Sequence, residues 1–338
     1  MSGITAVVPV WNGRALLERL LRSLEGQTRP AAELVVVDNG STDGAPELAR
    51  SRGARVIPMG RNEGFAAAVN RGIQASGGEW IAVLNSDVEL DAGYFETLLA
   101  AASAPDIWFA TGKILSYEST QAGTPALLDG CFDLLCRGGT AWRAGNGRAD
   151  GPAFSCARQI YSAPWTAALF RAELFRRVGV LETSFESYLE DVDFGLRCAL
   201  AGYAGLYVPT AIARHRGSAT LGRWHPETVR RISRNQVFLV KRHYPRRALV
   251  RCGWPILAAQ LLWGALAARH GAALAWVRGK WEGIRGHPGA CKESQFHDSR
   301  ALETLLRSNE HSIRNLQAAS EFDWYWRVYL LLTRGEAN

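Results

Sequence analysis

The sequence is poor in cysteine and has no pattern that would tie its cysteines together. None of the six, Cys131, Cys136, Cys156, Cys198, Cys252 and Cys291, forms a C-x-x-C pair or a zinc-ligand spacing. We therefore expect reduced thiols in a cytosolic protein rather than a disulfide framework. The first nine residues lead into a strand pattern without a basic segment, so no signal peptide is expected.

The sequence also lacks a hydrophobic run of the usual membrane-spanning length. Its longest uncharged run, residues 252–268, has 17 residues and includes glycine, proline and glutamine. A spanning helix takes about 20 mostly apolar residues. Four tryptophans lie in this region and arginines flank it, which favours a helix pair over residues 252–281 that lies on a membrane surface. A buried helical hairpin is the alternative.

Acidic residues are almost absent from one segment. Residues 214–251 contain 11 Lys and Arg but only one acid, Glu227, whereas residues 1–213 contain 18 basic and 23 acidic residues. A basic segment of this kind indicates an anionic partner, such as a diphosphate ligand, anionic lipid head groups or nucleic acid. No nucleic-acid-binding motif accompanies the segment, so we expect no nucleic acid partner.

The composition and periodicity predict an α/β fold. The chain has 338 residues, 47% of them hydrophobic, which is enough to bury a large core and excludes disorder. Strand and helix patterns alternate along the first hundred residues, which predicts a doubly wound, mostly parallel sheet. The expected strands are 5–10, 34–37, 54–58, 80–84, 107–114, 207–208 and 211–214, with a hairpin or irregular structure over 127–147. The expected helices are 14–26, 45–51, a segment after residue 64, 91–102, 163–178, one within 181–201, and 301–332.

Polar residues follow several of the expected strands. Trp11 and Asn12, Asp38 and Asn39, and Asn85 with Asp87 come directly after apolar runs. In a parallel sheet these positions converge on one crevice, where ligands bind. A carboxylate at Asp38 could accept hydrogen bonds from a base or ribose, and one at Asp87 could bind a divalent cation. Taken alone, Asp38 is better explained as a helix cap or turn residue, and Asn85–Asp87 as a turn.

A crowded acidic segment and a histidine complete the candidate chemistry. Glu190, Asp191 and Asp193 fall within four positions among apolar residues, which predicts a general base unless the charges are paired. We expect Asp193 to pair with Arg197. His215 follows a short strand between two arginines, which would favour the neutral, metal-binding imidazole.

The ordered set of motifs resembles glycosyltransferase family 2, with its GT-A fold, and in particular its rhamnosyltransferase-like branch. The motifs are Val7–Gly13, Val35–Gly44, Asn62–Phe65 with Asn70–Gly72, Asn85–Asp87, and Leu189–Asp193 with His215–Thr220. The resemblance spans about residues 4–245. It implies donor-binding roles for Pro9, Trp11, Asn12, Asp38, Ser41, Asn62, Gly64, Asn70, Asn85, Ser86 and Asp87.

The resemblance further implies an inverting sugar transfer. The donor would be a dTDP-, UDP- or GDP-linked sugar, with rhamnose as one candidate, and the acceptor a saccharide or lipid-linked glycan in cell-surface polysaccharide synthesis. Asp191 would be the catalytic base, and Glu190 would orient the base or the acceptor. Trp165 and Thr166 would contact the acceptor. Asp87 and His215 would hold Mg²⁺ or Mn²⁺.

Two departures from the family pattern accompany this resemblance. Asn85 stands where the metal motif normally begins with Asp, and Gly179-Val180-Leu181-Glu182 replaces the usual Gly-Phe-Asp-Glu. The alternative function is a non-catalytic nucleotide-sugar-binding or scaffold subunit at the membrane.

We expect four regions along the chain. Residues 1–115 would form the donor-binding half and residues 116–245 the acceptor and catalytic half of one domain. Residues 246–290 would be membrane-associating helices, and residues 291–338 a C-terminal amphipathic helix. The protein would be cytoplasmic and peripheral at the inner membrane face, where an anionic surface is a partner, and a homo-oligomer is left open.

Overall fold

The structure is a computed structural model that describes residues 3–121, 126–217, 224–289 and 298–333. The chain divides into two compact units. The first comprises Met1–Phe132, Gly145–Cys198 and Gly202–Gly217. The second comprises Asp133–Ala144, Ala199–Ala201 and Ser218–Asn338. The chain therefore leaves the first unit more than once.

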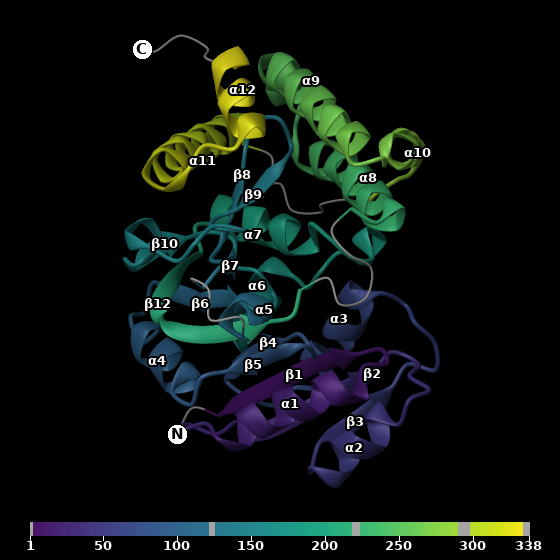
Figure 1. Cartoon of the computed structure of the whole chain (residues 1–338), viewed down its shortest axis with the longest axis vertical. Helices are drawn as coiled ribbons and strands as arrows, with labels where there is room; N and C mark the ends of the chain where they lie inside the picture. The colour runs from purple at the N-terminus through teal and green to yellow at the C-terminus, as the bar shows by residue number, and fades with distance from the viewer. Residues whose placement is uncertain (1–2, 122–125, 218–223, 290–297, 334–338) are drawn as a thin grey trace. The chain divides into compact units, whose positions relative to one another are not determined.

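The first unit is built on a mixed, mostly parallel sheet (Figure 1). In the described residues the main path of the sheet runs β10-β12-β6-β11-β4-β1-β2-β3, while β5 pairs with β12 and β7 with β6. The antiparallel β11 lies between β4 and β6, so that β4, β6 and β12 keep the same direction as β1, β2 and β3. The strands are β1 (Ile4–Val10), β2 (Glu33–Asp38), β3 (Arg55–Pro58), β4 (Trp80–Leu84), β5 (Val88–Leu90), β6 (Ile107–Ser116), β7 (Leu128–Gly130), β10 (Arg158–Ile160), β11 (Ala167–Arg171) and β12 (Ala204–His215).

Helices cover both faces of this sheet, as the alternating pattern predicted. Alternate residues of β1 explain the two layers, because successive side chains point to opposite faces. Ala6 and Val8 belong to the apolar core formed with α1 (Arg14–Glu25), α2 (Ala45–Ser51) and α4 (Tyr94–Ala101). Val7 faces α3 (Phe65–Ala75) instead, where a Cβ on Gly72 would lie 2.3 Å from the Val7 Cγ1. The remaining helices of this unit are α5 (Tyr117–Gln121), α6 (Ala172–Val178), α7 (Glu190–Leu200) and the 3₁₀ turns η1 (Pro152–Phe154) and η2 (Thr183–Phe185).

The prediction was wrong over residues 163–178. That segment is not one helix, because Ala167–Arg171 forms the central strand β11 and only Ala172–Val178 is helical. A strand buried on both faces has no alternation of polar residues, so its pattern resembles that of a buried helix. The two short strands expected at 207–208 and 211–214 are one strand, β12, with an irregularity between Val208 and Ile212.

The second unit consists of helices packed around a two-stranded hairpin. Its elements are β8 (Asp133–Leu135), β9 (Ala141–Arg143), α8 (Pro226–His243), α9 (Arg246–Arg269), α10 (Ala273–Arg285), α11 (Ser299–Ser320) and α12 (Trp324–Leu332). The hairpin β8–β9 confirms one of the two readings of residues 127–147. The single helix expected over 301–332 is wrong, because the segment forms two helices, α11 and α12, and hydrogen bonds between the Gln317 side chain and the N–H and carboxylate of Asp323 span the junction.

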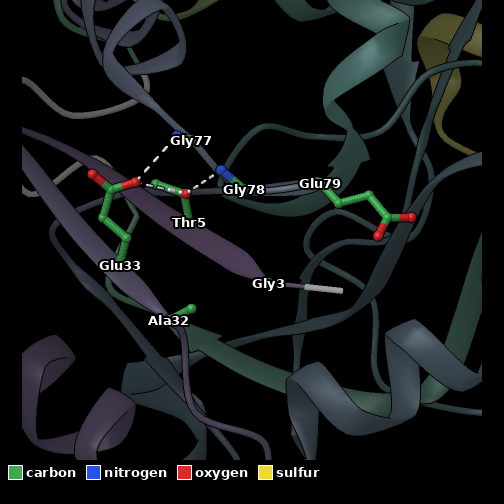
Figure 2. A pocket seen from close by; sticks show the side chains of 7 residues that line it. All are labelled: Gly3, Thr5, Ala32, Glu33, Gly77, Gly78 and Glu79. Atoms are coloured by element: carbon green, nitrogen blue, oxygen red, sulfur yellow. Dashed lines mark hydrogen bonds between the residues drawn. The ribbon is translucent and has the colours of Figure 1, made fainter. Parts of the chain in front are cut away.

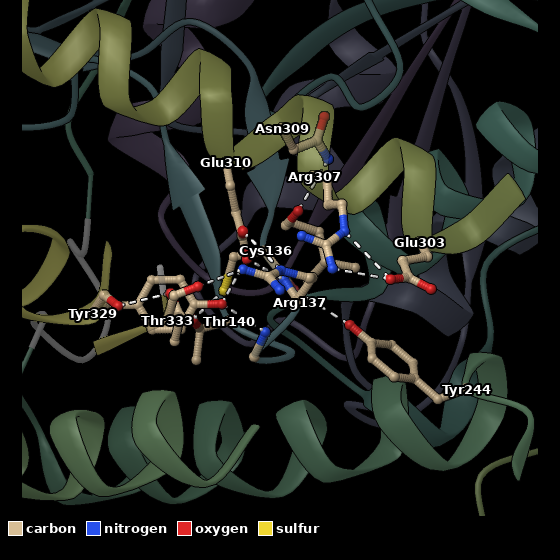
Figure 3. Close-up of polar contacts among 12 residues, drawn as sticks. Cys136, Arg137, Thr140, Tyr244, Glu303, Arg307, Asn309, Glu310, Tyr329 and Thr333 are labelled. Carbon is tan, nitrogen blue, oxygen red and sulfur yellow. Dashed lines mark hydrogen bonds and ion pairs between the residues drawn. The ribbon is translucent and has the colours of Figure 1, made fainter. Parts of the chain in front are cut away.

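A buried ion pair fixes the hairpin to α11 (Figure 3). The Arg137 Nε donates to the Glu310 Oε2 over 2.8 Å, and the Arg137 backbone N–H donates to the Glu310 Oε1 over 2.9 Å. The Tyr329 hydroxyl also donates to the Glu310 Oε1, over 2.6 Å. Arg137 and Glu310 are 6% and 7% exposed. Burial, the largest effect, raises the pKa of Tyr329, which keeps its hydroxyl protonated and able to donate.

Several basic residues of the segment 214–251 are paired within the protein. Arg230 pairs with Glu227 and Glu282, and Arg231 pairs with Glu227. Lys241 donates to three backbone carbonyls at the end of α10. Arg230, Arg231 and Lys241 are therefore engaged within the protein rather than free for an anionic partner, and Arg223 lies outside the described residues. Among the described residues Cys131, Cys136, Cys156, Cys198 and Cys252 are free thiols, as expected.

Candidate active site

The predicted polar residues lie at one edge of the sheet. Trp11 follows β1, Asp38 ends β2, Asp87 follows β4 and His215 ends β12. Because these four strands run in the same direction, their carboxyl ends share an edge. This is where an open α/β sheet binds its ligand.

The loops after β1 and β2 are joined by hydrogen bonds. The Asn12 N–H donates to the Ser41 Oγ over 2.9 Å, and the Thr42 N–H donates to the Asn12 Oδ1 over 2.9 Å. The Asp38 Oδ1 accepts from the Ser41 N–H over 2.8 Å. The Trp11 side chain beside this network is 48% exposed. The expected donor-side residues here therefore form one preorganised surface, with Pro9 buried in β1 behind it.

Asn39 joins the loop after β2 to the loop before α3. Its Nδ2 donates to the Asn62 Oδ1 and to the Gly64 carbonyl, and its Oδ1 accepts from the Glu63 N–H. Gly40 permits this approach, because it has a φ of +86° and a Cβ there would lie 2.8 Å from the Arg61 Cα. Asn62 and Gly64 thus lie beside Asn39, the residue that follows Asp38.

Asn70 has a different role from the one expected. It is buried, its Nδ2 donates to the Leu181 carbonyl, and its Oδ1 accepts from the Leu181 N–H. Both ends of its amide are therefore engaged with backbone. Asn70 anchors the segment that leads to α7, and this contact is at odds with direct binding of a donor.

The most distinctive group at this edge is a histidine between two carboxylates. The His215 Nε2 lies 3.0 Å from the Asp87 Oδ1, and the His215 Nδ1 lies 3.0 Å from the Asp129 Oδ2. Asn85 also approaches, with its Nδ2 placed 3.4 Å from the His215 Nε2. Burial opposes the charged imidazole, but hydrogen bonds and charges from Asp129 and Asp87 outweigh it and raise the pKa of His215 from 6.5 to about 10. The expectation that neighbouring arginines keep His215 neutral is therefore wrong for the metal-free chain.

The Asp87 and His215 side chains fit two coordination positions of a divalent cation whose other positions are filled by the bound substrate and water. Two neighbouring ligands of an octahedral ion, each bonded at about 2.1 Å, lie about 3 Å apart. The Asp87 and His215 atoms have this separation. In the described residues no group of three or more His, Cys, Asp or Glu side chains is arranged to hold a metal. Diphosphate oxygens and water would therefore have to supply the remaining positions, as is common for Mg²⁺.

Asp129 was missed by the sequence analysis. It lies in β7, far from every motif, and only the pairing of β7 with the end of β6 carries it to His215. A carboxylate on the second nitrogen of a metal-binding histidine fixes the ring orientation and the tautomer.

The acidic helix α7 follows a segment that contacts the start of α3. Asp193 is 0% exposed and its Oδ2 accepts from the Arg197 Nε over 3.0 Å, which confirms the predicted pair. Glu190 and Asp191 are buried in the first turn at 6% and 9% exposure. The Asp191 backbone carbonyl accepts from the Ser162 hydroxyl over 3.4 Å.

The chain before α7 is strained. Tyr188 and Leu189 have φ values of +72° and +68°, and Glu186 has +59°. Such left-handed non-glycine residues cost about 1–3 kcal/mol each and gather at functional sites. The Glu186 carbonyl accepts from the Ala66 N–H at the start of α3, which ties this segment to the donor-side loops.

Two expected acceptor residues are not open to a ligand. Trp165 is 2% exposed, and its ring packs against Phe170 and Phe194 with centroid distances of 4.7 and 5.0 Å. A ring so enclosed offers no face to a sugar, so the stacking role does not hold. Thr166 is 5% exposed and its carbonyl accepts from the Asn85 N–H over 2.9 Å, so it positions the loop after β4. Residues 218–220 of the last motif lie outside the described residues.

A shallow hollow lies at the opposite edge of the sheet (Figure 2). It is lined at the amino ends of β1, β2 and β4, and its Glu33 carboxylate accepts from the Thr5 hydroxyl and the Gly77 N–H. These contacts satisfy the carboxylate, and no predicted site residue lies there.

Comparison with known proteins identifies the class. The family model for glycosyl transferase family 2 matches residues 5–179. N-acetylglucosaminyl-diphospho-decaprenol L-rhamnosyltransferase of Mycobacterium tuberculosis is 31% identical over 246 residues, which cover 66% of this chain and 79% of the relative. Pre-mycofactocin glycosyltransferase of the same species is 29% identical over 227 residues, 65% of this chain and 44% of that protein.

Solved structures share the fold at low sequence identity. A GalNAc-T7 structure with UDP, GalNAc and Mn²⁺ has a TM-score of 0.60 and 16% identity, covering 78% of this chain and 51% of that one. The mannosyltransferase PcManGT of Pyrobaculum calidifontis, with GDP-Man and Mn²⁺, has a TM-score of 0.51 and 17% identity, covering 98% and 86%. Together these comparisons show a nucleotide-sugar glycosyltransferase with the GT-A fold. The chain belongs to glycosyl transferase family 2.

Proposed function

We propose that this chain is a metal-dependent, inverting glycosyltransferase that acts on a saccharide or lipid-linked glycan in cell-surface polysaccharide synthesis. The observation that carries the proposal is the Asp87–His215–Asp129 group at the carboxyl edge of a sheet whose neighbouring loops are joined by hydrogen bonds. The rhamnosyltransferase name of the M. tuberculosis relative supports a rhamnose donor and a diphospho-polyprenol acceptor. A UDP-, GDP- or dTDP-linked sugar remains compatible with the site.

The donor would bind along the loops of residues 1–115. Asp38 would accept hydrogen bonds from the base or ribose, and Asn12, Ser41, Asn62 and Gly64 would shape the surface around it. Asp87 and His215 would hold Mg²⁺ or Mn²⁺, with Asn85 and Ser86 beside them. A cation bound there supplies positive charge where negative charge gathers on the departing diphosphate.

Asp191 would act on the acceptor, which residues 116–245 would hold. Its carboxylate takes the proton of an acceptor hydroxyl as that oxygen forms a bond to the anomeric carbon. The bond from that carbon to the diphosphate oxygen breaks with its electron pair, so the nucleotide diphosphate leaves and the configuration inverts. Buried Glu190, next in sequence, would orient the acceptor or the base.

The proposed location is the cytoplasmic face of the membrane, as a peripheral protein. A polyprenol-linked acceptor is confined to a bilayer, so the enzyme must work at its surface.

The proposal is tested by separating donor binding from turnover. Calorimetric titrations with UDP-, GDP- and dTDP-sugars, each with and without Mn²⁺, should reveal one donor whose affinity requires the cation. That donor should then be hydrolysed slowly in the absence of an acceptor, in a manner that depends on Asp191. Metal-dependent binding without any hydrolysis or transfer would favour a non-catalytic binding subunit instead.

A further inference from the structure

Helix α9 is fixed to the second unit along one face. Ala259 and the Pro255 carbonyl pack so closely on the hairpin that a Cβ on Gly138 would lie 2.3 Å from the Ala259 Cβ. The Gln260 Nε2 donates to the Gly138 carbonyl over 2.8 Å, and the Tyr325 hydroxyl of α12 donates to the Ala259 carbonyl over 3.1 Å. This face of α9 is part of the folded protein.

The opposite face of α9 is apolar and exposed. Val250, Trp254, Leu257 and Leu261 follow one another at helical spacing and are 83%, 56%, 50% and 56% exposed. The Trp254 Nε1 donates to the Leu332 carbonyl, which brings the exposed end of α12 beside this row. Apolar rows of this size on a folded surface mark an interaction site.

The surroundings of this row are basic. Helix α9 contains no acidic residue, and it carries exposed Arg246 and Arg247 in its first turn and exposed Arg269 at its end. On α10, which packs against α9, Trp281 and Ile284 are also exposed, and the Arg285 guanidinium lies over the Trp281 ring at 4.0 Å. An exposed apolar face with basic ends and amphipathic tryptophans fits an anionic lipid surface.

We propose that α9 lies in the plane of an anionic membrane, with the row from Val250 to Leu261 among the lipids and its arginines at the head groups. Of the described helices, α9 alone has the length and hydropathy to cross a bilayer. A crossing would place the Gln260–Gly138 hydrogen bond and the attached hairpin in hydrocarbon, which is costly. The membrane attachment itself does not depend on the proposed function. Only its purpose, access to a lipid-linked acceptor, rests on that proposal.

The electrostatic part is tested by flotation of the full chain with phosphatidylglycerol–phosphatidylcholine vesicles and with phosphatidylcholine vesicles alone. The paired substitutions Arg246→Gln and Arg247→Gln should weaken partitioning into the anionic vesicles about 30-fold, at about 1 kcal/mol per arginine. Arg22→Gln with Arg50→Gln removes the same charge from exposed positions of the first unit, and should leave partitioning unchanged. Equal effects of the two pairs would overturn the assignment of the surface.

The apolar part is tested by Val250→Asp with Leu257→Asp, which should abolish vesicle binding and leave the unfolding transition unchanged because both side chains are exposed. Lipids brominated near the head groups should quench the tryptophan fluorescence of the bound protein more than lipids brominated deep in the acyl chains. Trp254→Phe should reduce that quenching.

Washing the vesicles with carbonate should release the bound protein. Resistance to carbonate, or loss of a dimer in these variants without loss of vesicle binding, would refute the in-plane attachment. Donor affinity measured in solution is separate from all of these readouts, so it tests the proposed function independently.

Discussion

The buried ion pair between Arg137 and Glu310 makes a strong prediction about stability. Glu310→Gln would leave a single side-chain oxygen, so when that oxygen accepts from the Arg137 N–H and the Tyr329 hydroxyl, the change places the amide NH₂ against the Arg137 guanidinium. Removing one partner of a buried pair costs about 3–5 kcal/mol, because the other charge stays buried. Arg137 keeps a hydrogen bond from its NH2 to the Thr333 carbonyl, so we expect about 3 kcal/mol.

The assay is urea unfolding followed by circular dichroism, with Glu303→Gln as the matched control. Glu303 lies on the same helix but pairs with Arg251 and Arg307, whose side chains are 58% and 48% exposed. Exposed pairs of this kind contribute about 0–1 kcal/mol. With a urea slope of about 2–3 kcal/mol per molar, Glu310→Gln should lower the midpoint of the hairpin-containing transition by about 1 M or more. If both variants shift the midpoint equally, the hairpin is not held by this pair.

The remaining predictions concern the site and the sheet. Asp191→Asn should reduce transfer by about 10²–10⁴-fold at unchanged donor affinity, and a variant that retains full turnover would remove Asp191 as the base. His215→Ala should abolish the Mn²⁺ dependence of donor binding seen by calorimetry, whereas unchanged Mn²⁺ dependence would exclude it as a ligand. Asp129→Asn should weaken Mn²⁺ affinity about 10–100-fold, and without metal the ¹⁵N shifts of His215 should show the imidazolium losing its proton at lower pH, because one of the two carboxylates that raise its pKa is gone. Gly72→Ala should destabilise the chain by about 1–3 kcal/mol in urea, because the added Cβ meets Val7 across a packed core, and no change would mean that α3 can shift.

The sequence alone predicted the strands and helices whose hydrophobic residues follow a regular local pattern. The strand ends at Asp38 and Asp87 follow short apolar runs, and the direction of parallel strands then brings them to one edge. The pair of Asp193 and Arg197 followed from helical spacing alone. Such local rules do not depend on what the segment packs against.

Features set by tertiary packing could not be obtained in this way. The apolar pattern of strand β11 predicts a helix because the strand is buried on both faces. The burial of Trp165 among phenylalanines depends on that same strand, so the sequence alone does not show that its ring is closed to a ligand. Asp129 carries no local signal, since only the pairing of β7 with β6 brings it to His215. The basic segment predicted a cationic surface, but acids such as Glu282, distant in sequence, neutralise part of it.

The hairpin β8–β9 has a consequence for the order in which a ribosome delivers the chain. Arg137 is synthesised 173 residues before Glu310, the carboxylate that neutralises it. At about 5–20 residues per second, the interval is roughly 10–35 s, far longer than a hairpin needs to form. During that time strands that precede and strands that follow residues 133–144 in the sequence can join the first unit, whereas the hairpin still lacks its contacts with α9, α11 and α12. A nascent chain stalled before residue 310 should therefore be sensitive to protease within residues 133–144 and become resistant only when α11 has emerged.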